Sequence, residues 1–242
     1  MRYAAFAARN RKELLRDPFS WVFGVGLPLV LLLIISGLQR AIGQEIFRIE
    51  LFAPGIAIFG FSFITLFSGM LIAKDRANAF ILRVFASPLT AADYIAGYAL
   101  PMLPLGLLQA VLCLSTAIVL GLRVDAGIPL ALVALLPVIL MFIALGLLLG
   151  CLLSDTAVGG VTSILIQLVA FTSGMWFDLS LFGPTVRGIL YALPFAHALD
   201  AARAALAGDV SGALPHVAWC TGYTVVLFGL AIWVFRRRMR GE

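Results

Sequence analysis

The chain has 242 residues, of which 62% are hydrophobic and 12% are charged. A soluble domain carries about 25% charged residues, so this composition excludes a water-soluble globular protein and predicts an integral membrane protein. The formal net charge of +5 is not interleaved with stacking aromatic side chains. We therefore expect it to attract membrane lipid, and we expect no nucleic-acid partner.

Six apolar segments are long enough to cross a bilayer as helices, which takes about 20 residues each. Backbone polar groups must be paired inside the hydrocarbon, and the alternating pattern of a membrane barrel is absent, so helices are expected. The predicted spans are residues 19–38, 52–73, 97–121, 128–153, 158–177 and 217–235. The prediction is an all-α membrane protein in which residues 1–242 form one transmembrane domain.

The distribution of basic residues predicts the orientation of this domain. With six spans both termini lie on one side of the membrane, and placing them in the cytoplasm makes 12 of the 17 lysines and arginines cytoplasmic. This excess obeys the positive-inside rule. The cytoplasmic set is Arg2, Arg9, Arg11, Lys12, Arg16, Lys74, Arg76, Arg83, Arg236, Arg237, Arg238 and Arg240.

Two predicted cytoplasmic segments lie outside the spans. Residues 1–18 mix basic and apolar side chains and predict an amphipathic helix at the membrane interface, either a simple anchor or a part of gating. Residues 74–96 predict a short helix that stops at Ser87 and Pro88, followed by a capping box from Thr90 to Asp93. Such a helix is either gripped by a partner protein or lies on the membrane as a linker.

A third segment, residues 178–216, follows the fifth span on the outer side. Gly183, Pro184 and Pro194 break it into pieces that are too short to cross a core of about 30 Å. We expect these helices to enter the outer leaflet and return. Irregular backbone at that depth is tolerated beside protein or a water-filled cavity, which favours a transporter or a channel.

The motifs of common enzymes are absent. The two lysines, Lys12 and Lys74, follow Arg11 and Ala73, so the sequence contains no phosphate loop. No zinc-protease or hydrolase motif and no metal-ligand spacing is present, and we predict no catalytic residue, no metal and no directly bound cofactor. The spans also contain no ionisable side chain clearly at mid-depth, which disfavours an ion-coupled carrier.

Mildly polar and aromatic stripes run along the second and fifth spans. Small hydroxyl residues commonly mediate helix packing in membranes. The alternative is the wall of a path for an amphiphilic cargo, with hydroxyls that wet it and aromatic rings that hold an apolar body. The candidate path residues are Phe59, Ser62, Phe63, Thr65, Phe67, Ser68, Thr162, Gln167 and Phe171.

Four short motifs in the right order carry a family resemblance. They are LLRDP at residues 14–18, RVFASPL at 83–89, SGMWF at 173–177 and LPFAHALDAAR at 193–203. Together they resemble the permease subunits of type-2 ABC exporters over nearly the whole chain. The sequence departs from the family at KDRANAFI (residues 74–81), where a Gly-Thr stretch is common, and at Asp178, which stands where proline is common.

The resemblance implies a permease in a prokaryotic cytoplasmic membrane. It implies two copies of a partner ABC-type ATPase that holds ATP and magnesium, a second permease copy or homologue, and a drug, lipid or glycoconjugate as cargo. Implied ATPase-coupling residues are Lys74, Asp75, Arg76, Phe80, Arg83, Phe85, Ser87 and Pro88. Implied residues of an outer re-entrant gate are Phe177, Pro194, His197 and Arg203.

Two other functions stay open. His197, Asp200 and Arg203 fall on one helical face and are a candidate acid–base cluster for a membrane-embedded lipid-modifying enzyme. The other alternative is a passive channel, against which the absence of a charged ring in the spans argues.

Overall fold

The computed structural model describes residues 3–43, 48–78 and 89–239, and all regular structure in these ranges is helical. The elements are α1 (Ala4–Arg16), α2 (Pro18–Trp21), the π-helical η1 (Val22–Gly26), α3 (Leu27–Ile42), α4 (Ile49–Ala77), α6 (Ala91–Leu120), α7 (Gly127–Leu152), α8 (Asp155–Thr172), the 3-10 turn η3 (Leu179–Leu181), α9 (Pro184–Ala192), α10 (Pro194–Leu206) and α11 (Val210–Met239).

The prediction of six spans is confirmed. Within the described ranges, six helical stretches are long and apolar enough to cross a membrane. They are Pro18–Ile42, Ile49–Ala77, Ala91–Leu120, Gly127–Leu152, Asp155–Thr172 and Val210–Met239. The amphipathic N-terminal segment forms α1, and its place at a membrane interface stays a prediction.

The span boundaries differ from those expected by one to seven residues, and three of these differences change the segments outside the spans. The connection predicted at 74–96 is shorter, because α4 continues to Ala77 and α6 begins at Ala91. The fifth span helix ends at Thr172, five residues early, and the left-handed Gly174 (φ 83°) follows it. The outer segment ends sooner than residue 216, because α11 begins at Val210, two residues after the left-handed Gly208 (φ 75°).

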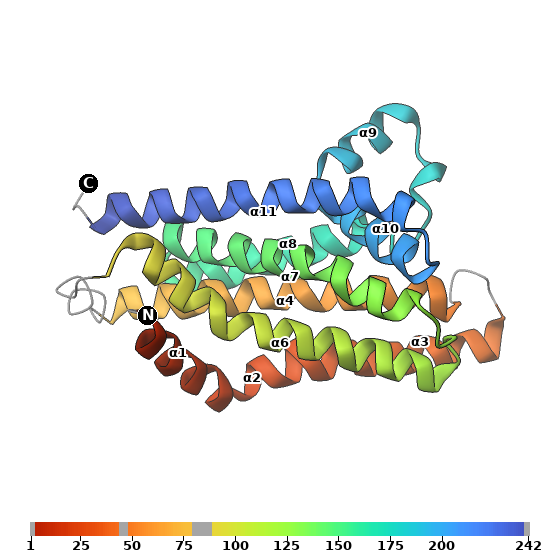
Figure 1. The fold of residues 1–242 in the computed structure, drawn as a ribbon, viewed down its shortest axis with the longest axis horizontal. Helices are drawn as coiled ribbons and strands as arrows, with labels where there is room; N and C mark the ends of the chain where they lie inside the picture. Colours follow the sequence, from red (N-terminus) through yellow and green to blue (C-terminus); the bar gives the residue numbers. More distant parts are fainter. Residues whose placement is uncertain (1–2, 44–47, 79–88, 240–242) are drawn as a thin grey trace.

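Helix α4 is the centre of the bundle. Figure 1 shows it running through the middle of the structure, and it packs on α7, α8, α6 and α3. Glycines let α4 and α7 approach closely: a Cβ atom at Gly146 would lie 2.1 Å from Ser68 Oγ, and one at Gly150 would lie 2.3 Å from the Gly69 carbonyl oxygen. Small residues are the usual means of such close packing in membranes.

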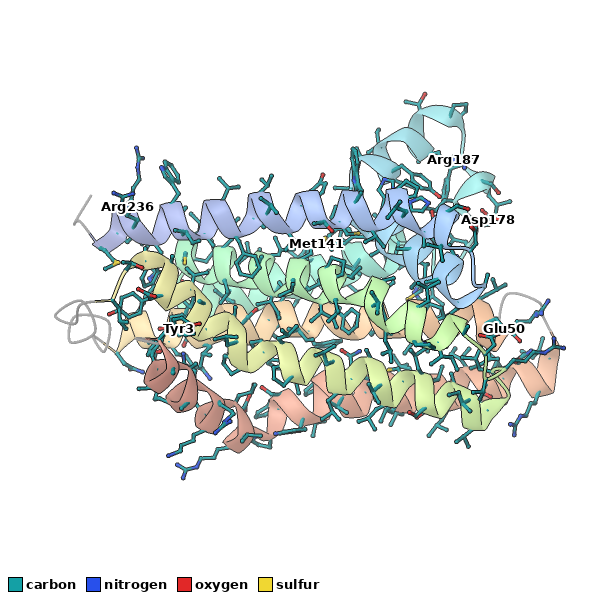
Figure 2. All side chains as sticks on the ribbon, in the orientation of Figure 1. Tyr3, Glu50, Met141, Asp178, Arg187 and Arg236 are labelled. Carbon is teal, nitrogen blue, oxygen red and sulfur yellow. The ribbon has the colours of Figure 1, made fainter. Side chains whose placement is uncertain are left out.

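The two ends of the bundle differ in composition. At one end, which we call the basic end, α4 and α11 terminate and α1 and α6 begin (Figure 1). At the opposite end, the far end, lie α9 and α10. Figure 2 shows Arg236 at the basic end, Glu50, Asp178 and Arg187 at the far end, and Met141 in the apolar middle.

The capping box predicted for residues 90–93 is confirmed and starts α6 at the basic end. The Asp93 amide donates to Thr90 Oγ1 over 3.2 Å, and the Thr90 amide donates to the Asp93 carboxylate over 2.9 Å. Two backbone donors that the helix leaves unpaired are thereby satisfied. Helix α6 therefore has a fixed first turn close to the end of α4.

Candidate functional site

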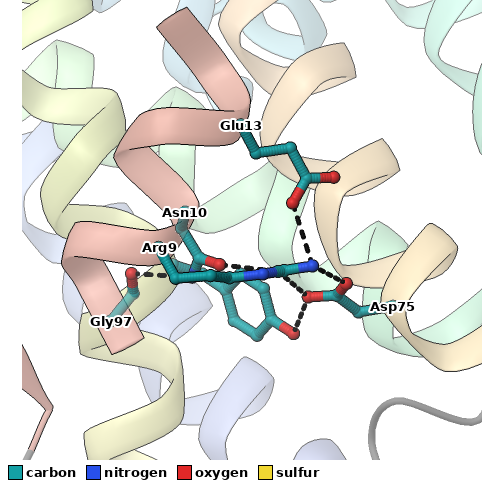
Figure 3. Close-up of polar contacts among 6 residues, drawn as sticks. Arg9, Asn10, Glu13, Asp75 and Gly97 are labelled. Atoms are coloured by element: carbon teal, nitrogen blue, oxygen red, sulfur yellow. Dashed lines mark hydrogen bonds and ion pairs between the residues drawn. The ribbon is translucent and has the colours of Figure 1, made fainter. Parts of the chain in front are cut away.

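A bidentate ion pair joins α1 to the end of α4. Arg9 donates from Nη1 and Nη2 to the two carboxylate oxygens of Asp75, over 2.6 and 2.8 Å. Asp75 is only 3% exposed, and the Tyr98 hydroxyl of α6 donates to it over 2.8 Å (Figure 3). Two-pronged pairs of this kind fix orientation as well as charge.

Neighbouring side chains extend this contact, which we call the clasp. Glu13 lies 3.0 Å from the Arg9 guanidinium, and Asn10 accepts a hydrogen bond from it over 2.8 Å. Asn10 in turn donates to the Gly97 carbonyl of α6 over 3.1 Å (Figure 3). Burial alone would lower the pKa of Arg9, but the hydrogen bond and charge of Asp75 and the charge of Glu13 outweigh it and raise that pKa. Arg9 therefore stays charged.

Aromatic packing seals the clasp against α6. The Phe6 ring meets Tyr94 and Tyr98 edge to face, with centroids 5.5 and 4.9 Å apart. A Cβ atom at Gly97 would lie 2.5 Å from Phe6 Cδ1, so the absence of a side chain there admits the ring. Helix α1 is consequently tied both to the last turn of α4 and to the first turns of α6.

The described coupling residues have three different environments. Lys74 is exposed, Asp75 belongs to the clasp, and Arg76 donates to the carbonyl oxygens of Gly150, Cys151 and Leu153 over 2.6–2.9 Å. Arg76 therefore satisfies the unpaired carbonyls at the end of α7. Five coupling residues lie outside the described part of the chain: Phe80, Arg83, Phe85, Ser87 and Pro88.

The hydroxyl stripe of α4 takes part in packing. Ser62 donates to the Phe59 carbonyl of its own helix, and Thr65 donates to the Phe142 carbonyl of α7 over 2.9 Å. Ser68 donates to the Ile64 carbonyl over 2.7 Å and reaches α7 at 3.4 Å. All three side chains are buried, so the structure favours the packing interpretation for them.

The predicted path residues of α8 lie on different faces of that helix. Thr162 is buried, and its hydroxyl has no hydrogen-bond partner in the described part of the chain. Gln167 and Phe171 are exposed on the outside of the bundle, Phe171 by 57%. A single path through this chain could therefore not be lined by Thr162, Gln167 and Phe171 as well as by the hydroxyl stripe of α4.

A cavity of about 460 Å³ lies among α1, α2, η1, α4, α6 and α8, and we call it the aromatic cavity. Phe23 of η1 stacks on Phe63 of α4 and on Phe19 of α2, with centroids 6.0 and 6.2 Å apart. Two predicted path residues, Phe63 and Phe67, are in its wall. The lining consists of Glu13, Leu14, Asp17, Phe19, Ser20, Phe23, Phe63, Leu66, Phe67, Met70, Leu71, Lys74, Met102, Ser163 and Ile166.

A second hollow of about 840 Å³, the basic groove, lies beside α1 at the basic end. It shares Glu13, Asp17 and Lys74 with the aromatic cavity, so the two hollows are adjacent. Its lining consists of Ala5, Ala8, Arg9, Lys12, Glu13, Arg16, Asp17 and Lys74. At these three shared residues the aromatic cavity adjoins the charged groove, and we call this junction the mouth.

The predicted gate residues lie at the far end, where His197 is hydrogen-bonded to two neighbours. His197 Nδ1 lies 2.7 Å from His216 Nδ1, and His197 Nε2 lies 3.0 Å from the Tyr191 carbonyl oxygen. Burial lowers the pKa of His197, and His216 lowers it further against the opposing effects of Tyr191 and Asp200. Pro194 begins α10, as expected for proline in a first helical turn.

Arg203 ties α10 to the start of α4. Its guanidinium donates to the Leu51 carbonyl over 3.0 and 3.2 Å and to the Gly174 carbonyl over 3.4 Å. Arg203 and Phe177 both line a hollow of about 490 Å³, and Phe177 meets Phe182 edge to face. Burial lowers the pKa of Arg203, partly offset by nearby carboxylates.

The candidate acid–base cluster does not act as a unit in this structure. His197 is paired with His216, Asp200 accepts from the Tyr191 hydroxyl over 2.7 Å, and Arg203 is held by backbone carbonyls. Each of the three side chains of this candidate cluster thus has its own partner. The described residues also contain no group of acidic, histidine or cysteine side chains suited to a metal ion.

Sequence reasoning missed Arg9 and Tyr98 at the clasp and Phe19 and Phe23 at the cavity. One signal was available: Asp75 ends an apolar span, where a carboxylate needs a positive partner. The cytoplasmic basic residues were recognised, but nothing in the spacing selects Arg9 among them. Phe19 and Phe23 have helical spacing, and Phe23 already lies in the π-helical turn η1.

Comparison with known proteins identifies the family. The sequence model of the family described as ABC-2 type transporter matches residues 2–207, which contain the clasp, the aromatic cavity and the far-end residues up to Leu206. A search of curated proteins finds no match. Because the match covers most of the chain and the fold has six candidate spans, this protein belongs to the ABC-2 type transporter family and is the multi-pass transmembrane subunit of an ABC transporter.

Proposed function

We propose that this subunit exports an amphiphilic substrate, a drug, lipid or glycoconjugate, across the cytoplasmic membrane of a prokaryote. A separate ABC-type ATPase, present in two copies, binds ATP with magnesium and drives the cycle. A second permease copy or homologue completes the assembly. The family supports the ATPase partner in general, and the absence of a phosphate loop in this sequence agrees with a motor on another chain.

The aromatic cavity is the observation that supports an amphiphilic substrate. Its volume of about 460 Å³ falls in the range of small-molecule sites, about 300–1,000 Å³. Four phenylalanine rings line it, and its charged side chains are the three that it shares with the basic groove. A wholly polar solute gains nothing from such a wall, whereas a molecule with an apolar body buries that body there.

The clasp supports a route for coupling. The residues between Ala77 and Ala91 connect α4 to α6, and the coupling segment is proposed to lie in this connection. Asp75 and Tyr98 bracket it, and both bond within the clasp. A displacement of the connection therefore reaches α1, which also lines the mouth of the cavity.

Reconstitution in liposomes with the partner ABC-type ATPase tests this function. We expect amphiphiles to stimulate ATP hydrolysis, and Phe63→Ala, which removes a cavity wall, to reduce that stimulation about tenfold. Val133→Ala is the matched control, since Val133 is 62% exposed on α7 and lies outside the cavity. An ATPase that does not bind the chain, or full transport without ATP, would exclude the proposal.

Thiol labelling tests the proposed orientation. The native cysteines Cys113, Cys151 and Cys220 are buried, so an added surface cysteine gives the main signal. In intact cells an impermeant maleimide should label Ser180→Cys at the far end but leave Asn78→Cys at the basic end unlabelled until the cells are opened. The opposite pattern would place the basic end outside.

A further inference from the structure

The charges around the shared mouth indicate which kind of amphiphile the cavity receives. Two acidic and four basic side chains line the basic groove. Both acids are already used within the protein: Glu13 lies 3.0 Å from Arg9, and Asp17 accepts hydrogen bonds from the Ser20 hydroxyl and from the first amides of α2. Arg9 itself is bound to Asp75.

Three cations remain at the mouth. Lys12, Arg16 and Lys74 are exposed, and the described part of the chain offers them no hydrogen bond or ion pair. Lys12 and Arg16 are four residues apart on α1, where like charges repel, and Lys74 approaches from α4. An anion in the groove would relieve this repulsion from two helices at once.

The aromatic cavity determines which chemical group the ligand needs next to its charged head group. Lys74 lines both hollows, so a head group bound at the three cations lies next to the aromatic cavity. Aromatic walls can also attract a cation, at about 0.5–2 kcal/mol. A cationic head group would nevertheless meet three unpaired positive charges at the mouth, and the electrostatic balance therefore favours an anion.

We propose that the cavity and groove together form a binding site for an anionic amphiphile, with a phosphate or similar head group at Lys12, Arg16 and Lys74 and the apolar body among Phe19, Phe23 and Phe63. Lysine and arginine are the usual side chains for such head groups. This inference rests on the proposed function and narrows its substrate class. All residues of the proposed site belong to one chain, so the inference is the same whether a second copy or a homologue completes the assembly.

Calorimetric titration of the full-length protein in neutral maltoside micelles tests the site. The probes are dodecyl phosphate, dodecyltrimethylammonium and inorganic phosphate. We expect saturable binding of dodecyl phosphate, no saturable binding of the ammonium compound, and at least about tenfold weaker binding of inorganic phosphate, which lacks the apolar body. Equal affinity for dodecyl phosphate and inorganic phosphate, or preference for the ammonium compound, would overturn the proposal.

Neutralising substitutions locate the head group. Lys12→Gln, Arg16→Gln and Lys74→Gln should each weaken dodecyl phosphate binding about fivefold. Arg11→Gln is the matched control, because Arg11 is an exposed cation on the same helix but does not line the groove. We expect it to change affinity less than twofold. An equal loss with Arg11→Gln would mean diffuse attraction by the basic surface and would refute the site.

Phe63→Ala tests the position of the apolar body. It should weaken dodecyl phosphate binding about tenfold and leave the affinity for inorganic phosphate unchanged. A tenfold loss for both probes, or for neither, would contradict the proposed placement of the apolar body.

Transport separates this inference from the proposed function. If reconstituted protein exports amphiphiles with ATP but the binding pattern shows no preference for anions, the anionic site is wrong and the exporter stands. If the binding pattern holds and no ATP-dependent movement occurs, the site is supported and the exporter is wrong.

Discussion

The two ends of the bundle hold their charges in different ways. At the basic end Arg9 and Asp75 form a bidentate ion pair, and the carboxylate is buried beside Tyr98. At the far end Arg203 donates to the carbonyl oxygens of Leu51 and Gly174. The first arrangement joins two full charges, whereas the second joins a charge to neutral dipoles. The clasp is therefore the contact whose stability depends most on having both partners present.

The largest expected effect is the loss of Arg9. Arg9→Met should lower stability by about 3–5 kcal/mol, because it leaves the buried Asp75 carboxylate without a counter-ion. Asp75→Asn should cost less, about 1–2 kcal/mol, since the Arg9 side chain is 37% exposed and can reach water. Thermal unfolding followed with a thiol-reactive dye measures both, because all three cysteines are buried. Arg11 is exposed and serves as the control. An equal loss of stability in Arg11→Met, or a larger loss in Asp75→Asn than in Arg9→Met, would contradict this account.

An apolar replacement of the whole clasp distinguishes stability from coupling. Arg9→Met, Asp75→Leu and Tyr98→Phe combined should recover about 2 kcal/mol or more relative to Arg9→Met alone, because no buried charge is left unpaired and only Asn10 Oδ1 loses a donor. We expect ATP hydrolysis in this variant to lose its stimulation by amphiphiles. Recovery of both stability and stimulation would show that the ionic character of the clasp is dispensable for transport.

The far end should respond more weakly. Arg203→Met should lower stability by about 1–3 kcal/mol, because two carbonyl oxygens lose their donor. Arg203→Lys should recover only part of this, since an ammonium group lacks the planar fork that spans Leu51 and Gly174. Thermal unfolding of the three proteins side by side provides the measurement. A loss as large as that of Arg9→Met would remove the difference between the two ends.

The smallest effect should be the pH dependence of the far end. Burial holds the pKa of His197 below its usual value, so between the two pKa values the unfolded chain binds more protons and stability rises with pH. Stability from this group is therefore complete above the unfolded pKa of about 6.5 and is lost as the pH falls below it. The groups that face the ring are His216, Tyr191 and Asp200.

Unfolding temperatures measured from about pH 8 to pH 5 test this sign. The decrease on acidification should be smaller in His197→Gln than in the parent protein, because glutamine does not titrate. A decrease of the same size in the variant would assign the pH dependence to other groups.

The sequence was sufficient for features that depend on local patterns. Apolar length predicted the six spans, and the Thr90–Asp93 spacing predicted the capping box that the structure contains. The clasp joins residues 66 positions apart, and no periodicity relates Arg9 to Asp75. Which basic residue meets the buried acid depends on how α1 returns to the bundle, and that is decided by tertiary packing.

The direction in which side chains point from a helix was the second feature that could not be predicted from the sequence. The hydroxyl stripe of Ser62, Thr65 and Ser68 was compatible with either packing or a path, and only the position of α7 decides in favour of packing. Phe63 and Phe67 lie one position from stripe residues, yet they face the aromatic cavity. A helix with neighbours on most sides gives its faces different roles, which composition alone does not separate.

The last turn of α4 has a mechanical consequence. Asp75 holds α1, and the next residue, Arg76, holds the carbonyl oxygens at the end of α7 and in the turn before α8. Successive residues point about 100° apart around a helix axis, so these two attachments leave α4 in different directions. A rotation of this single turn therefore strains both attachments together, and the helices on its two sides must move in concert or the turn must stay fixed.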